Sequence, residues 1–88
     1  MISKEKFKSK LLDPPDCILG KRGISNEFLE HVRALIKQNK IIKVKALKSI
    51  AKTHDIEELA HKLAEKTDTL LVDMRGKTFI LSKYPVNR

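Results

Sequence analysis

Several features common in secreted, membrane and metal-binding proteins are missing from this sequence. Its 88 residues include one cysteine, no tryptophan, one tyrosine and three phenylalanines. A lone Cys17 excludes an intramolecular disulfide and is typical of a reducing compartment. No apolar run reaches the roughly 18 residues of a membrane span, and the N-terminal lysines precede no apolar signal core. We therefore expect a cytoplasmic protein that neither spans nor binds a membrane.

Side chains for catalysis or metal binding are also sparse. His31, His54, His61 and Cys17 have none of the ligand spacings, such as Cys-x2-Cys, that are typical of metal sites. The glutamates fall on helix surfaces, and nothing indicates the buried cleft in which a carboxylate acts as acid or base. We therefore expect no enzymatic activity, no metal and no cofactor. Because Phe28 belongs to an apolar stripe and other aromatics are few, a base-stacking surface is not expected either.

Positive charge, in contrast, is abundant. Nineteen lysines and arginines against eleven acidic residues give a formal charge of +8, and the isoelectric point is about 9.8. Such an excess indicates an acidic partner, nucleic acid first and an anionic membrane surface second. The plainer alternative is that the charge serves solubility alone.

Hydrophobic periodicity predicts a single α/β domain over residues 1–88, in the order α-β-α-β-α-β-β. The expected helices are 3–12, 26–39 and 56–66, and the expected strands are 16–19, 41–47, 69–74 and 78–82. Pro14-Pro15 ends the first helix, and the connection 48–54 either extends a strand or begins a helix. We expect a small mixed sheet with helices packed on it, a monomer, and a tail that frays from about residue 85.

A basic loop between two glycines is the most distinctive stretch. It consists of Gly20, Lys21, Arg22 and Gly23, between a strand and the helix 26–39. The glycines allow a tight turn and close approach to a ligand, and Ser25 is a good N-cap, so free amides open directly after the loop. Amides, a positive helix end and two cations together favour a phosphate. The alternative is an ordinary strand-to-helix turn that happens to be basic.

Two further basic pairs are candidates for the same ligand. Lys43 and Lys45 are two apart on a strand, so they share one sheet face and give a row of positive charge. Arg75 and Lys77 flank Gly76 in a predicted hairpin turn. For both pairs the alternative is a solvated surface, and the sequence does not place the hairpin relative to the loop.

The motifs Ile18-Leu19-Gly20-Lys21-Arg22-Gly23-Ile24-Ser25, Ile41-Ile42-Lys43-Val44-Lys45 and Arg75-Gly76-Lys77-Thr78-Phe79-Ile80-Leu81 occur here in order. In sequence and spacing they resemble the YhbY-like proteins, the stand-alone form of the CRM (chloroplast RNA splicing and ribosome maturation) domain. The resemblance covers about residues 3–85. Thr67-Asp68-Thr69 departs from the family's frequent glycine pair, and Ser82-Lys83-Tyr84-Pro85 is only similar to its usual ending.

The resemblance implies a fold similar to the C-terminal domain of bacterial translation initiation factor three, and it implies RNA binding. It places the family's glycine loop on Gly20, Lys21, Arg22 and Gly23, similar to the backbone-clamping loop of KH domains. The resulting hypothesis is a protein that binds structured RNA, ribosomal RNA or a pre-ribosomal particle, and assists its maturation. The expected RNA-binding residues are Gly20, Lys21, Arg22, Gly23, Ser25, Lys43, Lys45, Arg75 and Lys77. The alternative is a module whose basic face docks an acidic protein.

Overall fold

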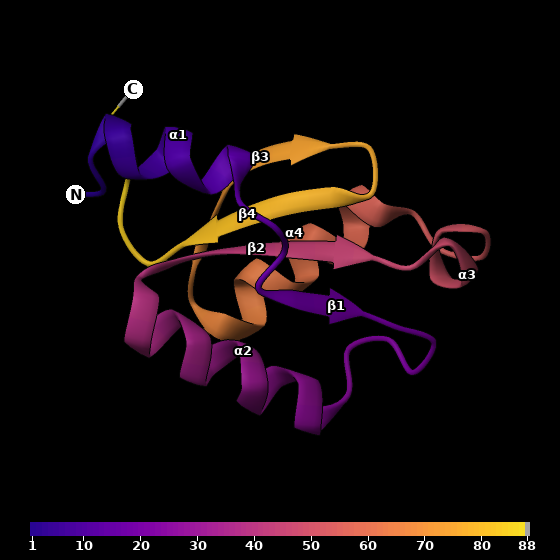
Figure 1. Cartoon of the computed structure of the whole chain (residues 1–88). Coiled ribbons are helices and arrows are strands. Elements are labelled where there is room, and N and C mark those ends of the chain that lie inside the picture. Colours follow the sequence, from indigo (N-terminus) through magenta and orange to yellow (C-terminus); the bar gives the residue numbers. More distant parts are fainter. Residues whose placement is uncertain (88) are drawn as a thin grey trace.

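The computed structural model describes residues 1–87 and consists of one four-stranded sheet with helices on both faces (Figure 1). The chain runs α1 (Lys4–Leu12), β1 (Cys17–Leu19), α2 (Asn26–Asn39), β2 (Ile41–Ala46), α3 (Lys48–Ala51), α4 (Ile56–Thr67), β3 (Leu70–Arg75) and β4 (Thr78–Ser82). The strands lie in the order β1-β2-β4-β3; β1 is parallel to β2, and the other pairs are antiparallel. The predicted α/β class with a mixed sheet is confirmed.

One face of the sheet is covered by α2 and α4. Alternation along β2 turns Ile42, Val44 and Ala46 to this side, where they join the apolar stripes of both helices in the larger core cluster. All three side chains are completely buried. At about 25 cal/mol per Å² of apolar area removed from water, this layer is the main source of stability.

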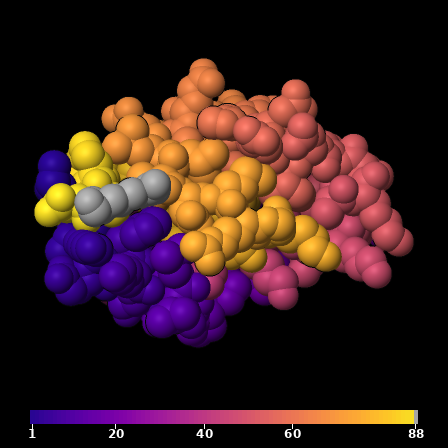
Figure 2. Space-filling view, turned by 90° about the horizontal axis from the view of Figure 1, so that it is seen from above, coloured from indigo at the N-terminus to yellow at the C-terminus, as the bar shows by residue number. Residues whose placement is uncertain are grey.

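The other face is only partly covered. Helix α1 contributes Phe7, which packs with Ile2, Ile41 and Ile80 in a smaller cluster. Figure 2 shows the indigo N-terminal segment side by side with the yellow C-terminal residues on this side of the molecule. Because α1 is short, the part of this sheet face nearest the glycine loop stays open to solvent.

The structure adds detail at two places that the sequence left unsettled. The connection 48–54, which the sequence left ambiguous, contains the short helix α3. In the tail, where fraying was expected from about residue 85, the Ile2 amide donates to the Pro85 carbonyl and the Asn87 amide donates to the Ile2 carbonyl, both at 2.8 Å. Pairing of the two ends orders backbone that local sequence alone would leave free. Arg88, the last residue of the predicted tail, lies outside the described residues.

Candidate nucleic-acid interface

Three basic segments converge at one end of the sheet. Since β1 and β2 are parallel, the loop after β1 and the chain after β2 leave the sheet at the same end. There the Leu47 amide donates to the Leu19 carbonyl (2.9 Å). The Ala46 amide donates to the Lys77 carbonyl (2.7 Å), so the β3–β4 turn lies at this end of the sheet as well. Figure 1 shows the loop, α3 and the hairpin turn together at the right of the sheet. The position of the hairpin, open in the sequence, is thereby decided.

The glycine loop is a tight turn in which the two glycines differ. The Gly23 amide donates to the Gly20 carbonyl (2.9 Å), and Gly23 has φ +69°, a left-handed conformation that strains other residues. Gly20 does not have a positive φ, and a methyl group there would meet Leu47 Cδ1 at an ordinary 3.6 Å. Gly23 is therefore required for the turn itself, whereas Gly20 leaves the backbone uncovered.

The start of α2 keeps part of its positive end available. Ser25 is the N-cap, as predicted, and its Oγ accepts from the Phe28 amide at 3.1 Å. The Ser25 amide is already taken up by the Gly23 carbonyl (3.1 Å). The amides of Asn26 and Glu27, however, have no acceptor among residues 1–87. These are the groups that a helix start can offer to an anion.

Lys21 and Arg22 extend from this loop into solvent. Both are exposed, and neither side chain forms a hydrogen bond or ion pair within the described part of the chain. They border an open hollow of about 370 Å³. The loop lines this hollow with Gly20, Gly23 and Ser25, and the first turns of α2 line it with Glu27, Phe28 and His31. We call this hollow the loop recess. It joins two unpaired cations and free amides, which is the arrangement that binds a phosphate.

Beside the loop, the open sheet face carries a cross-strand row. Ile18 pairs with Lys45, Lys45 with Thr78, and Thr78 with Arg75, so the four side chains share one face. Ile18 is 53% exposed, Lys45 is exposed, and Arg75 is exposed with its Nε 3.5 Å from Asp73 Oδ2. Three strand spacings separate its ends by roughly 14 Å. This cross-strand row gives a basic track that leads from the loop to the hairpin.

Lys43 does not belong to that track. Its Nζ donates to the carbonyls of Leu11 and Asp13, both at 2.8 Å, at the C-terminal end of α1. Its own amide donates to Asp16 Oδ2 (2.7 Å), which also accepts from Lys10 Nζ (3.1 Å). A cation at a helix C-terminus satisfies carbonyls that the helix leaves unpaired. The structure thus engages Lys43 in holding α1 on the sheet.

Other residues of this end were not singled out by sequence reasoning. Lys77 is exposed at the hairpin, as expected, but Lys48 and Lys52 on α3 also lie exposed beside the loop. Ile50 of the same helix comes within 3.9 Å of the position a Gly23 Cβ would occupy, so α3 supports the loop from behind. The basic character of 48–54 was the only signal, because a four-residue helix has too little periodicity to be read.

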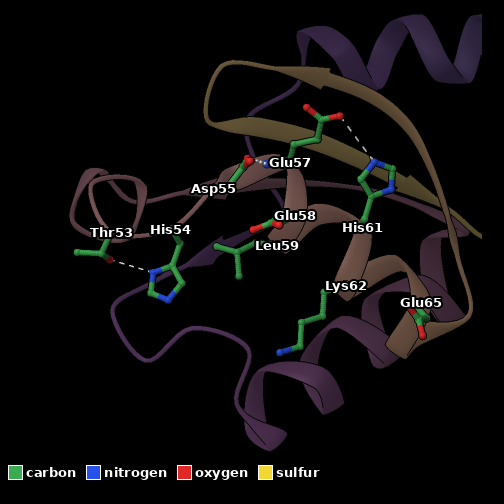
Figure 3. Close-up of a pocket in the computed structure, with 9 residues that line it drawn as sticks. All are labelled: Thr53, His54, Asp55, Glu57, Glu58, Leu59, His61, Lys62 and Glu65. Atoms are coloured by element: carbon green, nitrogen blue, oxygen red, sulfur yellow. Dashed lines mark hydrogen bonds and ion pairs between the residues drawn. The ribbon is translucent and has the colours of Figure 1, made fainter.

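A second and larger hollow, of about 880 Å³, runs along α4 and differs in charge (Figure 3). Asp55, the N-cap of α4, accepts from the Glu57 amide (2.9 Å), and Glu57 Oε1 lies 3.9 Å from His61 Nε2. Glu58 and Glu65 also line this groove, which we call the acidic groove. Its carboxylates disfavour phosphate, so size alone does not make it the nucleic-acid site.

Cys17 has no reactive character. It is buried in β1, and burial, with a smaller contribution from the Asp16 carboxylate, raises the pKa of its thiol from 9.0 to about 12. The thiol is therefore neutral and packs as an apolar group. Within residues 1–87, no three histidine, cysteine or acidic side chains are arranged to hold a metal ion, and none of the helices has the length and apolarity to cross a bilayer.

Comparison with known proteins supports the mixed α/β fold described above. None of the curated proteins compared with the chain matches it. A solved structure that does match is the solution structure of a hypothetical protein from Staphylococcus aureus, described as "a putative RNA binding protein". The two share 21% sequence identity with a TM-score of 0.69 over 97% of this chain and 91% of the other, which shows a common fold. The model of the CRS1 / YhbY (CRM) domain matches residues 5–83, and the chain therefore belongs to this family.

Proposed function

We propose that this chain is a single-domain RNA-binding protein, monomeric and cytoplasmic, which engages structured RNA, ribosomal RNA in particular, and assists ribosome assembly or RNA maturation. Family membership and the RNA-binding description of the Staphylococcus aureus structure support RNA binding. They also point to a binding protein rather than an enzyme. The observation that carries the proposal is the pair of unpaired cations, Lys21 and Arg22, beside free amides at the start of α2.

The geometry supports binding through the RNA backbone. Lys21 and Arg22 contact phosphates, while Gly20 and Gly23 present no side chain that would keep the sugar-phosphate chain at a distance. Lys45, Arg75 and Lys77 extend the positive surface along the same end of the sheet. Lys43 is left out of the proposed surface because its ammonium group is engaged by α1.

The test is a titration of a labelled ribosomal RNA stem-loop at several salt concentrations, with the Lys21→Ala/Arg22→Ala double variant. Two surface contacts of up to about 1 kcal/mol each predict a loss of roughly ten- to thirty-fold in affinity. The slope of log K against log salt should fall by about 0.7–0.9 for each lost phosphate contact. Unchanged affinity and slope would exclude the loop from binding.

A matched control separates position from net charge. Lys62→Ala/Lys66→Ala removes two exposed cations from α4, neither of which lines the loop recess. We expect at most a small, salt-sensitive change in affinity from this variant. If both double variants lose the same affinity and slope, binding depends on overall charge and the loop is not a site. Retention of an acidic protein after nuclease treatment, lost in the loop variant, would favour protein docking instead.

A further inference from the structure

The loop recess contains groups that a phosphate alone does not use. Besides Lys21 and Arg22, it is lined by Glu27, Phe28 and His31 of α2. It is an open depression of about 370 Å³, so a group bound there would lie against its lining side chains and would not be enclosed. A purely electrostatic contact to RNA would need neither a hollow nor an aromatic wall.

Phe28 has two roles in this wall. It is only partly buried: it packs against the larger core cluster, and it also lines the loop recess. His31 is exposed and lies three residues further on, so the two rings are neighbours on one helix face. Flat side chains of this kind are the surfaces on which unpaired RNA bases stack. The apolar stripe in the sequence accounts for the buried part of Phe28 and not for the exposed part.

Glu27 makes a second phosphate unfavourable at this wall. Its carboxylate stabilises the start of α2, but it also repels anions, so only a neutral part of a nucleotide suits the space beside it. A carboxylate accepts hydrogen bonds and donates none, and it pairs with the exocyclic amino group of cytosine. Uracil has a carbonyl oxygen at that position, and a carboxylate repels it because both groups are hydrogen-bond acceptors.

We propose that the loop recess binds one unpaired nucleotide, with its phosphate at Lys21 and Arg22, its base stacked on Phe28 and His31, and Glu27 selecting cytosine over uracil. This rests on the proposed function and deepens it, because it names the part of an RNA that the loop receives. The favoured substrate is a looped-out or hairpin-loop nucleotide, since a base inside a duplex is not accessible.

The experiment compares two RNA hairpins with the same stem, one with a loop of cytidines and one with a loop of uridines, and a blunt duplex of that stem. For the unmodified protein we expect the cytidine loop to bind roughly three- to ten-fold more tightly than the uridine loop, and both more tightly than the duplex. Equal affinity for the two loops would overturn the selection by Glu27, and equal affinity for loop and duplex would overturn the recess as a base site.

The chain provides matched controls for the variants. Glu27 and His31 are one turn apart at the start of α2, as Glu57 and His61 are at the start of α4. Glu27→Gln should abolish the preference for cytosine, because an amide pairs with either base, whereas Glu57→Gln should leave it intact. His31→Ala should weaken loop binding at least about five-fold, and His61→Ala should not.

Two further measurements keep the outcomes distinct. Phe28→Leu retains an apolar side chain for the core but removes the ring, and a thermal melt shows whether any loss of binding comes from unfolding. If His31→Ala and Glu27→Gln bind both loops normally while Lys21→Ala/Arg22→Ala does not, the base site is wrong and the proposed function survives. If the loop variant also binds normally, the proposed function fails with it.

Discussion

The starts of α2 and α4 can be compared directly, because they share a design and differ in surroundings. Each helix begins with a side-chain oxygen as N-cap, Ser25 in one and Asp55 in the other. Each has a glutamate in its first turn and a histidine one turn later, and each borders a hollow on the surface. The hollow at α2 is lined by two cations and one carboxylate, whereas the hollow at α4 is lined by four carboxylates and one lysine.

The difference shows how the residues around a helix start set the charge that the helix presents there. Both helices have a positive end. At α4 that end is neutralised within the chain by Asp55, Glu57 and Glu58. At α2 the first turn has only Glu27, and the preceding turn adds Lys21 and Arg22. The segment before the helix therefore decides whether positive potential remains for a ligand.

The largest effect on the difference between the two helix starts is expected from substitution of Gly23, a residue with no counterpart before α4. Its φ of +69° makes Gly23→Ala strained, and we expect the free energy of unfolding to fall by about 1–2 kcal/mol. RNA affinity should fall as well, because the turn that projects Lys21 and Arg22 is distorted. Urea denaturation and RNA titration measure the two effects.

Gly20→Ala is the control for that substitution. Its added methyl group meets Leu47 Cδ1 at an ordinary distance of 3.6 Å, so the unfolding free energy should change by less than about 0.5 kcal/mol. RNA affinity should still fall if the uncovered backbone at Gly20 approaches the ligand. Equal destabilisation by the two alanines would contradict the distinction drawn between the glycines.

A smaller effect is expected when each N-cap is removed in turn. Ser25→Ala and Asp55→Ala should each lower the unfolding free energy by about 1 kcal/mol, because each side chain accepts from an amide of its helix. Only Ser25→Ala should weaken RNA binding, since it loosens the turn that bears the free amides. Thermal melts paired with titrations provide the measurement, and a similar binding loss from Asp55→Ala would remove the asymmetry between the helices.

An effect smaller than that of either N-cap is expected from Glu57→Gln in the acidic groove. Loss of a charge at the helix start and of its 3.9 Å contact with His61 should cost about 0.3–0.5 kcal/mol. RNA affinity at low salt should rise less than two-fold, as a distant repulsion is removed, and the rise should vanish at high salt. A rise that persists at high salt would mean that the acidic groove itself contacts RNA.

Much of the fold could be predicted because local patterns were strong. The helix 26–39 and the strand 78–82 match α2 and β4 residue for residue, since caps, periodicity and turn residues all agree there. The short helix α3 and the paired tail could not be read. A single turn of helix has no periodicity, and the contacts of Pro85 and Asn87 are made with Ile2 at the far end of the chain.

For the candidate site, the sequence by itself determined the components: a basic turn bounded by glycines, a capped helix start and two lysines on one strand face. Those features are local, because glycine conformation, capping and side-chain alternation act within a few residues. Only the tertiary structure decided that Lys43 serves α1 while Lys45 faces solvent, that Arg75 continues the row from Ile18, and that Phe28 borders a recess. These depend on which distant segments lie beside each residue, and strand order and helix docking bring those segments together.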